Sequence, residues 1–202
     1  MDLSDYLPLS RRPAGDEATV SSNWARPLGE LLLQIADSVD AAGDTVREIR
    51  TDAPGSPTVE AVARALLVEI DRGPWWRRRT APGSAPADVA DESGARLAEA
   101  LRDRATTRLS GHPRTAVGLL GRTLVDGWEI AAALHTPIEV GPAVTGAVAL
   151  ARSLAGPFEV RAVARARTLV ASDHGWRIGH GQELVGTAEA IILFLYGRRA
   201  AD

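Results

Sequence analysis

The chain of 202 residues contains no cysteine, which excludes disulfides, thiolate metal ligands and a thiol nucleophile supplied by the protein. It also contains no lysine, because all 23 basic residues are arginine, and this excludes Schiff-base catalysis by a side-chain amine. The net charge of -3 gives no general attraction to nucleic acid. We therefore expect no nucleic-acid partner, and any thiol chemistry must use a thiol carried by a small molecule.

Long apolar runs are also absent. The longest, around residues 190–196, is far shorter than the roughly 18 to 20 residues that span a bilayer. Residues 1–9 mix acidic and apolar side chains and do not resemble a secretory signal. These features predict a cytoplasmic protein without a membrane partner.

Apolar residues spaced by three and four predict amphipathic helices along the first two thirds of the chain. The predicted helices cover residues 28–49, 58–72, 89–109 and 115–134. Thr58 is a good N-cap for the second helix, and Gly94 weakens the third. With an irregular N-terminal arm over residues 1–27, the economical architecture is a four-helix bundle over residues 28–138.

After Pro137 the pattern changes, and a small α/β domain is expected over residues 139–202. A helix is predicted over residues 143–154, and the β-branched, alternating character of residues 158–172 favours strands. The remaining predictions are a turn at 173–175, an extended segment at 176–178, a glycine-rich break at 179–181 and a helix at 187–196. The fold class is therefore mainly α.

Two segments resemble one protein family. Residues 124–131 are similar to the fourth helix of the DinB-like, mycothiol-dependent maleylpyruvate isomerase family, in which a His-Gly-Trp-Asp string is usual. Residues 171–179, with Gly186 and Gly197-Arg198, resemble its sterol-carrier-like C-terminal domain. The start of the second helix and the pair Trp75-Trp76 also fit, so the likeness spans roughly residues 28–199. It implies a DinB-like bundle, isomerase or transferase ancestry, and mycothiol as a possible cofactor.

The resemblance also implies a divalent metal, held by one histidine of the second helix and a Glu-x-x-x-His pair of the fourth. In this chain the three positions fall at Ala65, Arg122 and Asp126. An alanine has no lone pair and an arginine is a permanent cation, so the usual ligands are missing. We expect no metal site.

Arg122 and Asp126 are four residues apart, a spacing that lets them form an ion pair, and Glu129 lies three residues further on. One interpretation is a structural ion pair in a degenerate site. In the other, Arg122 binds a substrate carboxylate or enolate while Asp126 or Glu129 moves a proton, with burial raising the pKa of the acid.

Four further side chains are candidates for substrate binding: Glu69, Trp128, His174 and Arg177. Trp128 falls on the inward stripe of the fourth helix, as a core residue or as the wall of a pocket for an apolar ligand. His174 and Arg177 flank Trp176 and either bind an anion or simply form a turn.

The first hypothesis for function is a diverged, metal-independent enzyme of this family, possibly of specialised biosynthesis. It would act on a small anionic or carbonyl-containing metabolite by acid-base or electrostatic catalysis. The alternatives are a non-catalytic protein that binds a small ligand, and a conventional mycothiol- and metal-dependent isomerase or transferase. A homo-oligomer is among the possible assemblies.

Overall fold

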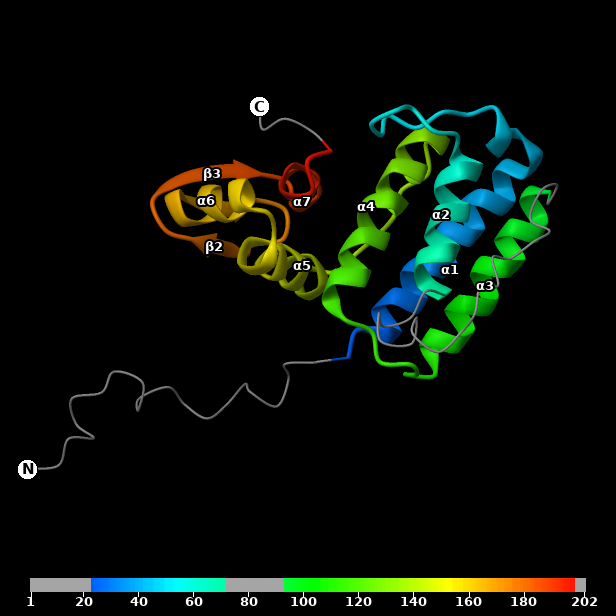
Figure 1. Ribbon diagram of the computed structural model, residues 1–202, viewed down its shortest axis with the longest axis horizontal. Coiled ribbons are helices and arrows are strands. Elements are labelled where there is room, and N and C mark those ends of the chain that lie inside the picture. The colour runs from blue at the N-terminus through cyan, green and yellow to red at the C-terminus, as the bar shows by residue number, and fades with distance from the viewer. Residues whose placement is uncertain (1–22, 72–92, 199–202) are drawn as a thin grey trace, which may run out of the picture.

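The computed structural model describes residues 23–71 and 93–198. The protein is mainly helical, with a small three-stranded sheet near the C-terminus. Figure 1 shows two lobes, a bundle of the first four α-helices and a C-terminal lobe that contains the sheet. The helix α4 lies on the side of the bundle that faces the C-terminal lobe.

The bundle consists of four helices and one short 3-10 helix. Their bounds are α1 (Ala25–Ala42), η4 (Gly43–Arg47), α2 (Val59–Asp71), α3 (Gly94–Leu109) and α4 (Val117–Leu134). Helix α1 packs mainly on α3 and also on α4, while α2 packs on α4 and α3. The helices α1 and α2 are therefore diagonal neighbours around a shared apolar core, which includes Leu32, Leu66, Leu101 and Leu124.

The first helix differs from its prediction at both ends. It begins at Ala25, inside the segment predicted as an irregular arm, where its backbone N–H donates to Asn23 Oδ1 at 3.1 Å. It ends at Ala42 and not at residue 49, because Gly43 adopts a φ of +55° that an α-helix cannot continue through. The 3-10 helix that follows still buries Val46.

Two predictions about glycine and capping also have clear outcomes. The N-cap at Thr58 is confirmed, because its Oγ1 accepts a hydrogen bond from the backbone N–H of Ala61 at 3.2 Å. Gly94 does not interrupt the third helix but is its first residue. A Cβ at this position would lie 2.0 Å from the carbonyl oxygen of Gly43, so glycine permits the contact between the two chain segments. The pair Trp75-Trp76 lies outside the described residues.

The C-terminal lobe combines three helices with three strands. Their bounds are α5 (Pro142–Ala155), α6 (Phe158–Ala166), β1 (Arg167–Ala171), β2 (Arg177–Gly179), β3 (Gln182–Gly186) and α7 (Ala188–Leu195). The strand order is β2-β1-β3, with β1 antiparallel to β2 and parallel to β3. The short connection between β2 and β3 therefore crosses past the start of β1.

The strand predicted over residues 158–172 is correct only in its second part. Residues Phe158–Ala166 form α6, because Val160 and Val163 are three apart and the alanines between and after them favour a helix. The strand β1 begins at Arg167, and β3 was not predicted at all. The helices predicted at 143–154 and 187–196 are confirmed as α5 and α7.

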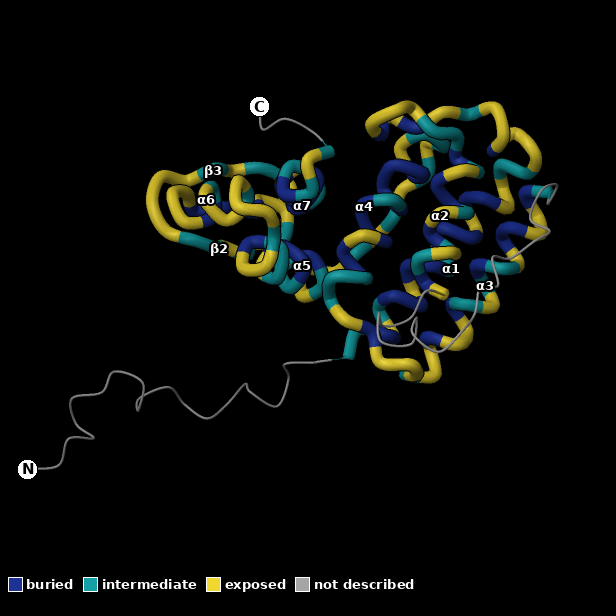
Figure 2. Tube along the Cα trace, in the orientation of Figure 1, coloured by how far each residue is buried: buried dark blue, intermediate teal, exposed yellow. Residues whose placement is uncertain are grey.

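Burial differs between the two lobes. Figure 2 shows buried segments recurring along each bundle helix, whereas α6 is largely exposed and the outer strands β2 and β3 contain no buried residue. Ala164 is the buried residue of α6. Among the described helices, none combines the length and the apolar character needed to cross a membrane.

Candidate functional site

The candidate site lies where the end of α7 meets α4. Helix α7 ends at Leu195, and Gly197 then adopts a φ of +71°, which reverses the chain. The backbone N–H of Gly197 donates to Phe194 O and that of Arg198 donates to Leu193 O, both at 2.9 Å. This is the Schellman arrangement that commonly terminates helices at glycine. It carries Arg198 toward α4.

Arg198 contacts two carboxylates of α4. Its Nη2 lies 3.3 Å from Asp126 Oδ1, and its Nε lies 3.5 Å from Glu129 Oε1. Arg122, one turn earlier on α4, donates from Nε to Oε1 of Glu69 on α2 at 2.6 Å. Arg122 and Asp126 thus form their ion pairs with these partners rather than with each other. The predicted pair is replaced by one pair between α4 and α2 and another between α4 and the segment that follows α7.

These charged groups border a pocket of about 360 Å³, within the range of roughly 300–1,000 Å³ typical of small-molecule sites. Its lining includes Glu69, Arg122, Asp126, Tyr196, Gly197 and Arg198. The pocket therefore lies between the bundle and the C-terminal lobe, with two guanidinium groups and two carboxylates on its walls.

Burial raises the pKa of Asp126 above the ordinary value of an aspartate. The charge of Arg198 opposes this increase, the carboxylate of Glu69 adds to it, and Arg122 opposes it again. A carboxyl group whose pKa is raised holds a proton closer to neutral pH, which is the property required of a general acid or base. Asp126 is only half-buried, so its pKa is raised while its carboxyl group stays accessible from the pocket.

Tyr196 provides the wall of the pocket nearest the start of α4. Its hydroxyl lies so close to the α4 backbone that a Cβ at Gly121 would be 2.1 Å from the oxygen. Burial raises the pKa of this phenol, with the charges of Arg152 and Arg122 opposing. The Arg152 guanidinium also lies 4.5 Å from the centre of the Tyr196 ring, in a cation-π contact. Tyr196 therefore remains a neutral hydrogen-bond donor at physiological pH.

Two smaller cavities continue along α4 from this pocket. Glu129, which is 9% exposed, lines the nearer one together with Trp128 and Arg198. Trp128 also lines a further cavity of about 280 Å³, in which His174 takes part. The three spaces adjoin one another, because the first two share Arg198 in their linings and the last two share Trp128.

The structure separates the two remaining candidates. His174 lies in the turn between β1 and β2, where its Nδ1 is 2.7 Å from Thr145 Oγ1. The same oxygen accepts a hydrogen bond from Trp176 Nε1 at 3.1 Å, which ties the turn to α5. Arg177 begins β2 and pairs with Glu183 on β3. His174 therefore belongs to the cleft along α4, and Arg177 belongs to the sheet.

The residues at the three positions where the resemblance implies metal ligands do not fit a divalent metal. Ala65 is exposed on α2 and offers no ligand atom. The nearby carboxylates of Glu69, Asp126 and Glu129 already face arginine guanidinium groups. Zinc requires about three protein ligands of N, S or carboxylate type. Within residues 23–71 and 93–198, no group of three histidines or carboxylates is placed to hold a metal ion.

Sequence reasoning did not identify Arg198 and Tyr196 as site residues. The available signal was the order of an apolar helix, a glycine suited to a left-handed conformation and then an arginine. That order predicts a helix end and a reversal of the chain, but not the helix that receives the arginine. Identifying the partner required the packing of α7 on α4.

No family model, no curated protein and no solved structure matches the chain.

Proposed function

We propose that the protein is an enzyme of small-molecule metabolism that acts on an anionic or carbonyl-containing metabolite by acid-base catalysis. We further propose that it is a diverged, metal-independent member of the DinB-like maleylpyruvate isomerase family. The observation that carries the proposal is Asp126, a carboxyl group with a raised pKa on the wall of a pocket that also holds Arg122 and Arg198.

The two arginines would bind the substrate. Each guanidinium has five N–H donors, and the contacts of Arg122 and Arg198 with carboxylates use only some of them. The remaining donors would hold a carboxylate or an enolate oxygen of the substrate, in the way that guanidinium groups bind such anions. A carbonyl oxygen held there would gain stabilisation as negative charge develops on it.

Asp126 would move the proton. Its carboxylate would take a proton from the carbon beside the substrate carbonyl, and the electron pair of that C–H bond would pass into the enolate. Protonated Asp126 would then return the proton to the same carbon or to the next carbon of the conjugated system. Glu129 contacts Arg198 from the buried side, so its role in this scheme is to hold that guanidinium beside Asp126.

The other candidates have different parts in the proposal. Glu69 positions Arg122 through their ion pair. Trp128 and His174 line the adjoining cavity and would contact a substrate longer than the first pocket. Arg177 has no part in it, because it pairs with Glu183 in the sheet. Mycothiol stays a prediction from the resemblance.

The second candidate function is a non-catalytic protein that binds a small ligand. The specific observation in its favour is that Arg198 contacts both Asp126 and Glu129, so the acid already has a structural partner. In that case the pocket would hold a ligand, and Asp126 would not exchange a proton with it. The conventional metal-dependent transferase is not proposed, because the donor set does not fit a metal.

Proton exchange in deuterium oxide tests the first candidate. The full chain is incubated with small 2-oxo acids, beginning with pyruvate, and exchange at the carbon beside the carbonyl is followed by proton NMR. We expect exchange with at least one compound, and a loss of roughly 100-fold or more in Asp126→Asn. Asp37→Asn removes an exposed carboxylate that pairs with Arg102 on the bundle, and this control should exchange as the wild type does.

Two outcomes would redirect the proposal. A folded Asp126→Asn variant with wild-type exchange would exclude Asp126 as the acid-base group. Binding of a compound, measured by calorimetry, without any exchange above the protein-free rate would favour the non-catalytic function.

A further inference from the structure

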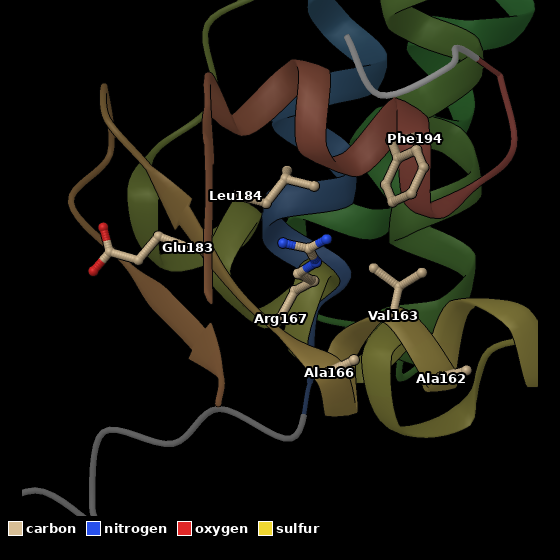
Figure 3. Close-up of a pocket in the computed structure, with 7 residues that line it drawn as sticks. All are labelled: Ala162, Val163, Ala166, Arg167, Glu183, Leu184 and Phe194. Carbon is tan, nitrogen blue, oxygen red and sulfur yellow. The ribbon is translucent and has the colours of Figure 1, made fainter. Parts of the chain in front are cut away.

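A second pocket lies entirely within the C-terminal lobe. It has a volume of about 520 Å³ and is bordered by α6, β1, β3 and α7. Figure 3 shows the side chains that line it. Its apolar wall consists of Ala162, Val163, Ala166, Leu184 and Phe194. It shares no lining residue with the pocket around Asp126.

The pocket is open to solvent, and the charged side chain that projects into it is Arg167, the exposed first residue of β1. In Figure 3 its guanidinium projects between Leu184 and Val163, on the side toward Phe194. Its hydrogen bond goes to the neutral side-chain oxygen of Gln182. Across residues 23–71 and 93–198, Arg167 forms no ion pair with a carboxylate. The pocket therefore presents a positive charge that the described part of the protein does not neutralise.

The second charged lining residue, Glu183, does not compensate for Arg167. Its carboxylate pairs with Arg177. Figure 3 shows this carboxylate on the far side of β3, away from the guanidinium of Arg167. Among the described lining residues, no carboxylate therefore faces the guanidinium of Arg167.

The backbone that carries Arg167 is held in place by the crossing connection between β2 and β3. Gly179 has a φ of +98°, and a Cβ there would be 2.3 Å from the carbonyl oxygen of Arg167. Gly181 has a φ of +109° and approaches the carbonyl oxygen of Ala166 equally closely, at 2.5 Å from an added Cβ. Thr168 Oγ1 also donates to Gly181 O at 3.0 Å. The start of β1, and with it the base of the Arg167 side chain, is thus fixed.

We propose that this pocket binds an amphipathic small molecule with an apolar body and one carboxylate, such as a medium-chain fatty acid. The apolar wall takes the hydrocarbon, whose removal from water is favourable. The guanidinium takes the carboxylate in a paired, charge-assisted hydrogen bond. The volume is within the usual range for small-molecule sites. This site does not depend on the function proposed for the cleft.

Calorimetric titration of the full chain with decanoate and with decanol, both below micelle-forming concentrations, tests the proposal. The two probes share a hydrocarbon chain and differ in charge. We expect decanoate to bind about two- to fivefold more tightly, since an ion pair with an exposed guanidinium is worth up to about 1 kcal/mol. Arg167→Gln should abolish this preference. Arg165→Gln, which removes an exposed charge of α6 outside the pocket lining, should retain it.

A second variant locates the site. Ala166→Trp places a large side chain at the exposed edge of the pocket, and circular dichroism verifies that the variant folds. It should weaken binding of both probes. The proposal fails if decanoate and decanol bind equally to the wild type, if Arg165→Gln loses the preference as Arg167→Gln does, or if Ala166→Trp binds decanoate normally. It also fails if decanoate does not bind. If light scattering then shows a dimer that Ala166→Trp dissociates, a second copy covers the pocket.

Discussion

The bundle interior and the cleft between the lobes both bury charged side chains, but they surround them differently. Arg108 on α3 is 7% exposed and donates to the carbonyl oxygens of Ile70 and Pro113 and to Thr115 Oγ1. Asp126 in the cleft faces an arginine and borders a pocket. The buried charge of Arg108 contacts neutral oxygens of the protein, whereas the half-buried carboxyl group of Asp126 borders an open pocket.

The pKa shifts of Arg108 and Asp126 agree with this difference. Burial lowers the pKa of Arg108, with the charge of Asp71 opposing, and no titration of an arginine follows near neutral pH. Burial raises the pKa of Asp126 toward the range where a carboxyl group exchanges protons. Burial alone therefore does not mark a functional group. The proposed role of Asp126 rests instead on a raised pKa beside an open pocket.

The largest expected effect is on the bundle side of the comparison. Arg108→Ala should lower the free energy of unfolding by roughly 3 kcal/mol, because two carbonyl oxygens and a hydroxyl lose their buried donor. Urea denaturation followed by circular dichroism measures the change. Arg104→Ala, on the same helix, removes an exposed ion pair with Asp71 and should cost only about 0–1 kcal/mol. Equal losses in the two variants would mean that the Arg108 contacts are not structural.

The next effect concerns the wall of the cleft. Gly121→Ala should lower the free energy of unfolding by about 1 kcal/mol, because the new Cβ meets the Tyr196 hydroxyl and overpacking outweighs the better helix propensity of alanine. In a Tyr196→Phe background the oxygen is gone, so the cost should shrink. A double-mutant cycle by urea denaturation measures this coupling.

Gly118→Ala is the matched control on the same helix. A Cβ at that position would meet Arg122 Nη1 at 3.8 Å, an ordinary contact, so the substitution should be neutral or stabilising. If Gly121→Ala behaved in the same way, the end of α7 would not be seated against α4, and the pocket around Asp126 would lose one wall.

Much of this arrangement follows from local patterns in the sequence. The spacing of apolar residues located α2, α4, α5 and α7, because each has one continuous face packed on a core. It failed at α6, a short helix whose β-branched valines indicated a strand, and at β3, whose identity depends on pairing with β1. The same limit applies to the site. The α4 residues share one face by spacing alone, but the partners Glu69 and Arg198 are 53 and 72 residues away from Arg122 and Asp126.

The smallest expected effect tests the cleft through pH. Because the pKa of Asp126 is raised in the fold, the folded protein binds more protons than the unfolded chain above the ordinary aspartate pKa of about 3.9. The contribution of Asp126 to stability is therefore complete below that pH and is lost as pH rises through the folded pKa. The melting temperature of the wild type minus that of Asp126→Asn should fall as pH increases from 4 toward 7.

Arg198→Gln sharpens this test, because the charge of Arg198 is the main influence that lowers the pKa of Asp126. Without that charge the pKa should rise further, so the loss of stability should extend to higher pH than in the wild type. At each pH, the melting temperature of the double variant Arg198→Gln/Asp126→Asn is subtracted from that of Arg198→Gln. Both proteins lack the arginine, so the difference reports the carboxyl group of Asp126 alone. A difference that increased with pH in either background would mean that the cleft favours the charged carboxylate. Asp126 would then be a structural ion-pair partner, as Arg108 is a structural donor in the bundle.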